Sequence, residues 1–324
     1  MNEEWGIEGD CGIICYNYRM TTKTIVTAGR KYLDIDAYAS MISYRELLKK
    51  TSDNEVLAFS TTKVNQTVPP MLRDLRYRLD EPVDVDGAKF VLVDVSNPDF
   101  FDTFVNIDSV SEIIDHHAGY EEFWRANKAV KSQIEPVGAV CTQIYERFVE
   151  AGEASLIDSD LAKLLIAGIL DNTINLKSKT TTKRDLRAYS ELKKLGSLSD
   201  GFGYEYFLAC EQEQMKDLKG AILGDMKAEW VSALLPEAIG QIIILHHNLV
   251  TQEVLEEVFA DYDKWMINVI SLEEGRSYLY CDGAETLAGL KKLFSEGKSR
   301  ENLLVLDDFV LRKEILRRGI EQGG

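Results

Sequence analysis

Short apolar segments alternate with helical patterns in the first half of the chain, and this alternation restricts the fold more than any other feature. Apolar runs of strand length occupy residues 24–29, 56–60, 89–95 and 110–114. Residues 36–50, 138–151 and 158–170 repeat apolar side chains at helical spacing. Apolar strands that alternate with helices indicate an α/β fold, with a parallel sheet covered by helices on both faces.

The length of 324 residues exceeds the size at which one core usually stops growing, so we expect two domains. The second half predicts a smaller α/β domain with a long helix over 205–227, strands at 238–245 and 264–272, and a helix at 251–262. We predict a first domain over 1–195, a linker over 196–204 and a second domain over 205–324. The sequence indicates no function for residues 1–23.

The net charge of −17 argues against a surface for double-stranded nucleic acid, because phosphate contacts require clustered Lys and Arg. A polyanionic substrate would need metal ions or a local basic cluster. The five cysteines lack CxxC spacing, the N-terminus lacks a basic leader, and no apolar run approaches a membrane span of about 20 residues. We expect a cytoplasmic protein without a membrane partner, and the sequence leaves open whether it forms a homodimer.

Aspartates end several of the apolar runs. Asp34, Asp94 and Asp115 lie at or just beyond predicted strand ends, where parallel sheets bind ligands. An unpaired carboxylate at the end of an apolar strand is costly to desolvate, so Asp94 is expected to meet a cation. Asp34 and Asp36 stand two residues apart in a strand-to-helix turn and could face two metals held close together. Helix capping is the alternative explanation for this pair.

The four histidines form two adjacent pairs. His116 and His117 directly follow Asp115, and an acid with two imidazoles at a strand end indicates a divalent-metal site for phosphate ester chemistry. Packing without a ligand role is the alternative. His246 and His247 end another predicted strand, where a structural role is favoured over a substrate contact.

The order of these motifs resembles that of the DHH phosphoesterase superfamily. The chain presents, in sequence, Asp34-x-Asp36, Asp94, Asp115-His116-His117 and Asp171-Asn172-Thr173. Residues 135–138 followed by Thr142 resemble the turn after the DHH motif in family II, manganese-dependent inorganic pyrophosphatases. Residues 176–185 are similar to the Lys-Ser-x-Thr-Thr segment of those enzymes and of exopolyphosphatases and Prune-like proteins.

The C-terminal half distinguishes between branches of this superfamily. RecJ-type nucleases, oligoribonucleases and cyclic dinucleotide phosphodiesterases carry a Gly-Gly-Gly-His loop, which this sequence lacks. Residues 225–227 instead resemble the start of the pyrophosphatase C-terminal domain. Residues 310–313 resemble its Ser-Arg-Lys-Lys phosphate-binding segment.

This resemblance implies a hydrolase with two metals between its domains, with water activated by the cations. The ligands implied for one cation are Asp36, Asp94, His116 and Asp171, whereas Asp34 and Asp94 would contribute to the other. Mn²⁺ suits these ligands best, with Mg²⁺ or Co²⁺ as alternatives. Asp94 and His117 are the expected catalytic residues. The expected substrate-binding residues are Arg30, His117, Lys177, Lys227, Arg312 and Lys313.

Two departures separate this chain from the pyrophosphatase pattern. Arg30 replaces a metal-binding histidine, and guanidinium cannot become a ligand, so the sequence leaves open one or two metal sites. An ungapped alignment with the pyrophosphatase motif also places Asn172 where those enzymes have a metal-binding aspartate. We expect a shift of one residue in the alignment to bring Asp171 to that position instead.

Three functions therefore stay open. The first is phosphoanhydride hydrolysis on pyrophosphate, short polyphosphate or a small phosphorylated metabolite. The others are phosphodiester cleavage of short oligonucleotides or cyclic dinucleotides, and binding of a phosphorylated ligand or a protein without turnover.

Overall fold

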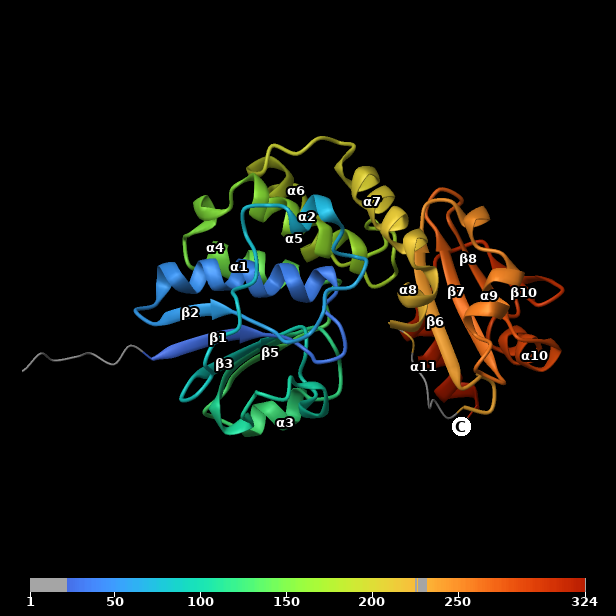
Figure 1. Ribbon diagram of the computed structural model, residues 1–324, viewed down its shortest axis with the longest axis horizontal. Helices are drawn as coiled ribbons and strands as arrows, with labels where there is room; N and C mark the ends of the chain where they lie inside the picture. Colours follow the sequence, from blue (N-terminus) through green and yellow to red (C-terminus); the bar gives the residue numbers. More distant parts are fainter. Residues whose placement is uncertain (1–21, 225, 227–231, 324) are drawn as a thin grey trace, which may run out of the picture.

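The computed structural model describes residues 22–224, 226 and 232–323, which form two sheets with separate cores (Figure 1). The expected Lys227 contact lies outside the described residues. The predicted α/β class is confirmed, since each sheet carries helices on both faces.

The first sheet is entirely parallel and has the strand order β2-β1-β3-β4-β5. Its strands are β1 (Lys23–Thr27), β2 (Glu55–Ala58), β3 (Lys89–Val93), β4 (Val110–Asp115) and β5 (Lys131–Ile134). The four predicted apolar runs form the first four strands. The sequence analysis did not predict β5, because this edge strand is partly exposed and has no apolar run.

Helices cover both faces of this sheet. They are α1 (Ile35–Thr51), α2 (Pro70–Arg73), α3 (Glu121–Ala126), α4 (Val140–Glu150), α5 (Ser159–Asn172) and α6 (Lys183–Leu195), with 3₁₀ turns at Pro98–Phe100, Ile107–Ser109 and Ala154–Leu156. In Figure 1, α1, α4, α5 and α6 lie on one face and α3 on the other. The face with four helices holds the larger apolar core.

The sequence analysis did not predict α6. Its N-terminus carries a capping box, in which Thr182 accepts from the amide of Asp185 and the Asp185 carboxylate accepts from the amide of Thr182. Asp185 is fully buried. The spacing of Thr182 and Asp185, typical of a capping box, was the sequence signal from which the start of this helix could have been predicted.

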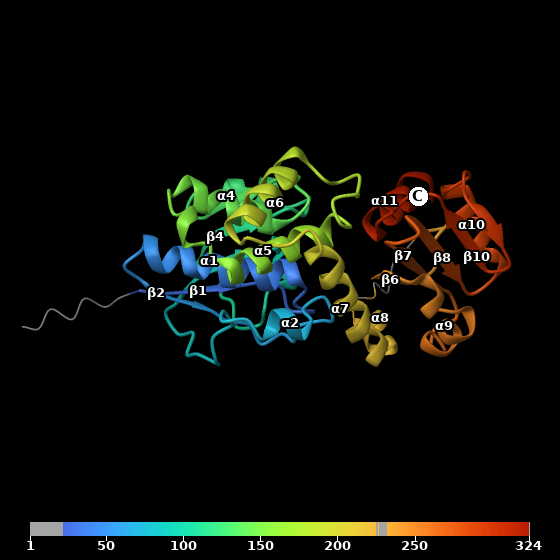
Figure 2. The ribbon, with the colours of Figure 1, turned by 90° about the horizontal axis from the view of Figure 1, so that it is seen from above.

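The second sheet is mixed, with the order β6-β7-β8-β10-β9 and only β6 and β7 parallel. Its strands are β6 (Ala238–Ile244), β7 (Trp265–Ser271), β8 (Arg276–Cys281), β9 (Lys298–Arg300) and β10 (Leu303–Leu306). Its helices are α8 (Leu218–Gly224), α9 (Gln252–Val258), α10 (Ala284–Leu293) and α11 (Arg312–Gly323), with a 3₁₀ turn at His247–Leu249. Residues of α8 and α9 share one core, whereas α10 and α11 share the core on the opposite face (Figure 2).

Helix α7 (Phe202–Lys216) joins the two sheets (Figure 1). The expected single helix over 205–227 is wrong, because α7 ends at Lys216, Asp217 follows as its cap, and α8 begins at Leu218. The Asp217 carboxylate accepts from the amide of Gly220 at 2.8 Å, so this side chain caps a new helix. α7 begins inside the expected linker, and Phe202 and Tyr206 pack in the first core. The domain boundaries stay a prediction.

Among the residues described here, no helix is both long and apolar enough to cross a membrane.

Candidate metal centre

Asp94 stands where β3 ends and carries an unusual backbone conformation. Its φ of 58° lies in the left-handed region, which is rare for a residue other than glycine. Its amide donates to the carbonyl oxygen of Ile114 on the neighbouring strand at 2.9 Å, which holds this turn in place. Within the described part of the chain, its buried Oδ1 has no hydrogen-bond partner. A strained backbone that presents an unsatisfied buried carboxylate oxygen points to a functional site.

His116 directs one ring nitrogen at Asp94. Its Nδ1 lies 3.1 Å from the carbonyl oxygen of Val137, and a carbonyl can only accept, so Nδ1 carries the proton. Nε2 is then the atom with a lone pair, and it lies 3.5 Å from Asp94 Oδ1. The side chain is only 3 % exposed. A carbonyl that fixes the tautomer of a buried imidazole is typical of a metal-binding histidine.

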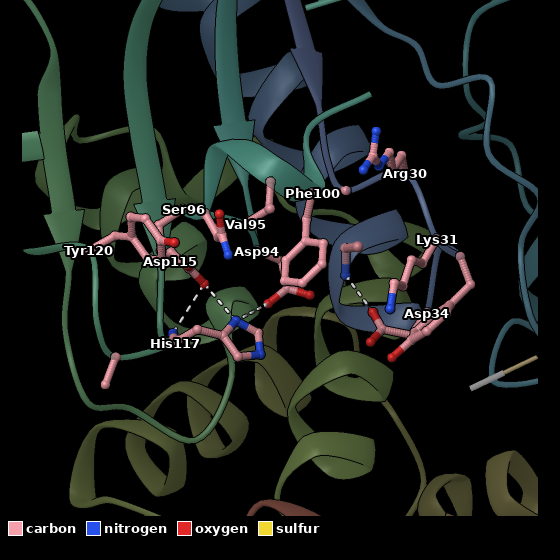
Figure 3. Close-up of a pocket in the computed structure, with 15 residues that line it drawn as sticks. Arg30, Lys31, Asp34, Asp94, Val95, Ser96, Phe100, Asp115, His117 and Tyr120 are labelled. Carbon is pink, nitrogen blue, oxygen red and sulfur yellow. Dashed lines mark hydrogen bonds and ion pairs between the residues drawn. The ribbon is translucent and has the colours of Figure 1, made fainter. Parts of the chain in front are cut away.

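His117 is oriented by Asp115 (Figure 3). Asp115 Oδ1 accepts from the backbone amides of His116 and His117 and lies 2.8 Å from His117 Nδ1. The side chain of His117 is 61 % exposed, so its ring borders solvent while Asp115 is fully buried. Asp115 therefore positions His117, a role that the sequence analysis did not assign to it.

These side chains fit a divalent cation. Asp94, His116 and His117 each offer one ligand atom, and the three atoms lie within 4.8 Å of one another. A carboxylate oxygen with imidazole nitrogens is a donor set that first-row divalent metals accept. The unsatisfied Asp94 oxygen is an independent sign, because a cation would supply the partner that the described residues do not provide.

The electrostatics of the centre favour a cation as well. Burial, and then the charges of Asp34, Asp36 and Asp115, raise the pKa of Asp94 well above its usual value. Burial, and then the charge of Asp34, raise the pKa of Asp36 to about 7. Burial, followed by the charges of His117 and Lys313, lowers the pKa of His116 to about 3. A bound cation would favour ionised carboxylates and a neutral imidazole, which are the forms that bind metals.

The side chains of Asp34 and Asp36 make hydrogen bonds to different helices. Asp34 caps α1, since its Oδ1 accepts from the amide of Ala37 at 2.9 Å. Asp36 is fully buried and accepts from the amides of Val140 and Cys141, both at 2.8 Å, at the N-terminus of α4. Asp36 therefore anchors α4 beside the centre. The predicted ligand roles of Asp34 and Asp36 stay predictions.

Asp171 and Asn172 are the last two residues of α5, so their side chains leave the helix about 100° apart. Asp171 Oδ1 accepts from the hydroxyl of Tyr206 at 3.1 Å. Both residues line the cleft described below. The next residues, 174–176, all have positive φ, so a tight left-handed turn follows the helix.

The expected substrate-binding cations lie in three places. Arg312 and Lys313 begin α11 and line a cleft of about 270 Å³ that His116, His117 and Asp171 also line, so this cleft lies between the two sheets. Lys177 lies over the ring of Phe309, 5.8 Å from its centroid, at a contact between the two halves.

Arg30 is exposed and lines a second hollow of about 280 Å³, which adjoins the cleft at Tyr32, Asp34 and His117. In Figure 3 its guanidinium points away from Asp94.

The second histidine pair, His246 and His247, makes contacts that hold elements around the second sheet together. His246 Nδ1 lies 2.9 Å from Glu211 Oε1, and Glu211 Oε2 accepts from the amides of Leu245 and His246. His247 Nδ1 lies 3.0 Å from Glu274, and its ring stacks on Tyr278. These contacts tie β6 to α7 and to β8, as the favoured structural role predicts.

Comparison with known proteins defines the class. Residues 24–169, which contain helices α1 to α4 and, apart from Lys23, the whole first sheet, match the family described as "DHH family, N-terminal domain". The resemblance seen in the motifs is thereby confirmed. Together with this site, the match supports a metal-dependent phosphohydrolase.

Proteins with similar sequences are named as inorganic pyrophosphatases. A manganese-dependent inorganic pyrophosphatase of Methanothrix thermoacetophila is 27% identical over 304 residues, which cover 90% of this chain and 95% of the relative. A probable enzyme of the same name from Staphylococcus saprophyticus is 26% identical over 274 residues, covering 79% of this chain and 85% of the relative.

Two solved structures share the fold. A putative family II inorganic pyrophosphatase of Methanococcus jannaschii has a TM-score of 0.61 at 21% identity, over 92% of this chain and 99% of the other. An exopolyphosphatase-related protein of Bacteroides fragilis has a TM-score of 0.51 at 15% identity, over 94% and 92%. The predicted two-unit DHH fold is therefore confirmed.

Proposed function

We propose that this protein hydrolyses phosphoanhydride bonds in pyrophosphate, short polyphosphate or a small phosphorylated metabolite, with Mn²⁺ as its metal. The observation that carries the proposal is the cleft in which His116 and His117 share the lining with Arg312 and Lys313. One side of this cleft suits a divalent cation, and the other presents two positive side chains. This combination matches a substrate made of linked phosphates.

Asp94 and His116 Nε2 are the central metal-binding groups in this account, and Asp34, Asp36 and Asp171 complete the coordination of one or two cations. A bound divalent cation lowers the pKa of a water and neutralises charge on phosphate oxygens. The relatives named as manganese-dependent support Mn²⁺ over Mg²⁺ and Co²⁺.

Side chains of the protein bind the substrate and supply the proton for the leaving oxygen. Lys313 and Arg312 bind phosphate oxygens, and the N-terminus of α11 adds its positive dipole to their charge. His117, held by Asp115, stands where it can donate a proton to the oxygen that leaves. Desolvation lowers the pKa of Lys313, and the charges of Asp94, Asp36 and Asp185 oppose this shift.

The test is phosphate release by the metal-stripped protein from pyrophosphate, tripolyphosphate and long-chain polyphosphate, with Mn²⁺, Mg²⁺ or Co²⁺ added back separately. Asp94→Asn removes the charge of the central ligand. Asp108→Asn makes the same change at an exposed aspartate just before β4 and serves as the matched control.

We expect Mn²⁺-dependent release that is lost in Asp94→Asn and kept in Asp108→Asn. Activity without added metal, or equal activity in both variants, would overturn the mechanism. Cleavage of a short oligoribonucleotide in place of all three phosphates would favour the diesterase alternative, and metal binding without any turnover would favour the non-catalytic one. The cytoplasmic location and the homodimer stay predictions.

A further inference from the structure

The hollow beside Arg30 is a second cavity next to the metal centre, and a phosphate bound by Arg312 and Lys313 in the cleft does not account for it. It measures about 280 Å³, close to the lower end of the roughly 300–1,000 Å³ of small-molecule pockets. Asp34, Asp94 and His117 form its inner end, and no residue of the second sheet lines it. Tyr32, Asp34 and His117 also line the interdomain cleft, so the two cavities meet at these three residues.

The walls of this hollow are chemically unlike those of the cleft. Val95, Phe100, Ala118 and Tyr120 supply apolar or aromatic surface that cannot neutralise a phosphate. In Figure 3 the ring of Phe100 stands above Asp94 and His117, with Tyr120 across the hollow. Arg30 and Lys31 line its other side, and Lys31 Nζ lies 5.2 Å from the centre of the Phe100 ring. This lining suits a planar organic group attached to a negatively charged one.

Phe100 is an exposed ring on a fixed backbone. Its side chain leaves 41 % of the residue exposed, whereas the adjacent Phe101 is buried in the core under the sheet. Its carbonyl oxygen accepts from the amide of Arg30 at 2.8 Å. The carbonyl of Ser96, in the same loop, accepts from the indole of Trp124 at 2.7 Å. A ring held open to solvent on a pinned loop loses little entropy when another ring stacks on it.

We propose that this hollow binds the aromatic group of an organic diphosphate, and that a nucleoside 5′-diphosphate represents the substrate class. The inference rests on the proposed hydrolytic function and specifies its substrate. The terminal phosphate occupies the cleft with Arg312 and Lys313, the inner phosphate meets Arg30 and Lys31, and the base stacks on Phe100. The bond to be cleaved then lies beside His117, one of the three residues that line both cavities.

The reaction balances as a hydrolysis. The oxygen of water bonds to the terminal phosphorus, and the bond from that phosphorus to the bridging oxygen breaks. The electron pair of that bond stays with the bridging oxygen on the nucleoside monophosphate, where His117 stands ready to donate a proton. The products are inorganic phosphate and the monophosphate, with no change in oxidation state.

The experiment compares ADP with inorganic pyrophosphate as substrates of the full-length, Mn²⁺-loaded protein. The readout is the ratio of kcat/KM for ADP to kcat/KM for pyrophosphate, because a folding defect lowers both values and cancels in the ratio. Phe100→Ala removes the ring, Phe100→Trp restores an aromatic face, and Tyr204→Ala removes an exposed ring on α7 outside the hollow.

We expect Phe100→Ala to lower the ratio about tenfold, as the loss of one base stack predicts. Phe100→Trp should retain the ratio, and so should Tyr204→Ala. An unchanged ratio in Phe100→Ala, or phosphate release from pyrophosphate but not from ADP, would overturn the aromatic site and leave the proposed function standing.

The absence of metal-dependent release from both substrates would overturn the proposed function instead. Calorimetric binding of ADP to wild type and Phe100→Ala would then test the hollow by itself. Tighter binding to wild type supports the site, whereas equal or absent binding overturns it.

Discussion

The hydroxyl of Tyr206 lies 3.1 Å from the carboxylate of Asp171 and 3.0 Å from the carbonyl oxygen of Thr67. Tyr206 is fully buried and belongs to α7, the helix that joins the two sheets. Asp171 lines the cleft that α11 closes from the other side. The connecting helix therefore orients an acid that lines this cleft as well as linking the two units.

Replacing Tyr206 by Phe should weaken this arrangement. The change removes the donor that these two part-buried acceptors share, so we expect the free energy of unfolding to fall by about 0.5–1.5 kcal/mol. Urea denaturation checks this value. Tyr204→Phe, on the same helix but half exposed, should have little effect. Equal stability of the Tyr206 variant and the wild type would contradict the positioning role.

Gly138 permits the turn that places the Val137 carbonyl against His116. A Cβ at this position would meet Thr173 Cγ2 at 2.6 Å and Asp185 Oδ2 at 2.7 Å. Gly138→Ala should therefore cost about 1–3 kcal/mol in unfolding free energy and weaken Mn²⁺ binding. Gly283→Ala is the matched control, because a Cβ there meets nothing within 4 Å. If both variants unfolded alike, the turn would not be constrained as described.

Lys313 is expected to act on the substrate rather than on folding. Its side chain is exposed at the start of α11, so removing its charge should change the stability of the fold little. Lys313→Met should lower kcat/KM for pyrophosphate about a hundredfold, as the loss of one charged donor predicts, without lowering the melting temperature. Lys291→Met, on the exposed face of α10, is the control. A comparable loss in the control, or none in Lys313→Met, would argue against phosphate binding by Lys313.

The sequence predicted the parts of the fold that follow from local pattern. Continuous apolar runs identified β1 to β4, and the acids that end them placed Asp94 and Asp115 at one edge of the sheet. The His116–His117 pair was recognised because an acid and two imidazoles directly follow a strand. These inferences succeed because strand burial and the position of strand ends are determined by neighbouring residues.

The remaining features depend on contacts between distant segments. Nothing near Asp36 indicates that both of its oxygens accept from α4, more than 100 residues away. The same holds for the hydrogen bond between Tyr206 and Asp171, and for the place of Lys313 in the cleft that His116 also lines. The break at Asp217 was missed because both flanking segments have helical character and a single capping side chain separates them.

The His246–Glu211 pair predicts a pH-dependent stability. The hydrogen bond with Glu211 raises the pKa of His246 above its usual 6.5, and the charge of Glu273 acts in the same direction. The stabilising contribution is therefore fully present below pH 6.5 and is lost as pH rises through the folded-state pKa. The difference in unfolding free energy between wild type and His246→Gln should shrink as pH is raised from about 5.5 to 8.5. A constant difference over this range would show that the pair does not titrate with folding.

The most direct test of the metal centre is the equilibrium affinity of the metal-stripped protein for Mn²⁺, measured by electron paramagnetic resonance on wild type, Asp94→Asn and Asp108→Asn. The structure predicts that wild type and Asp108→Asn bind Mn²⁺ equally. Asp94→Asn should bind at least about tenfold more weakly, because it loses the charge of the central ligand. Equal Mn²⁺ affinity in all three proteins, or no binding by wild type, would contradict a metal centre built on Asp94 and His116.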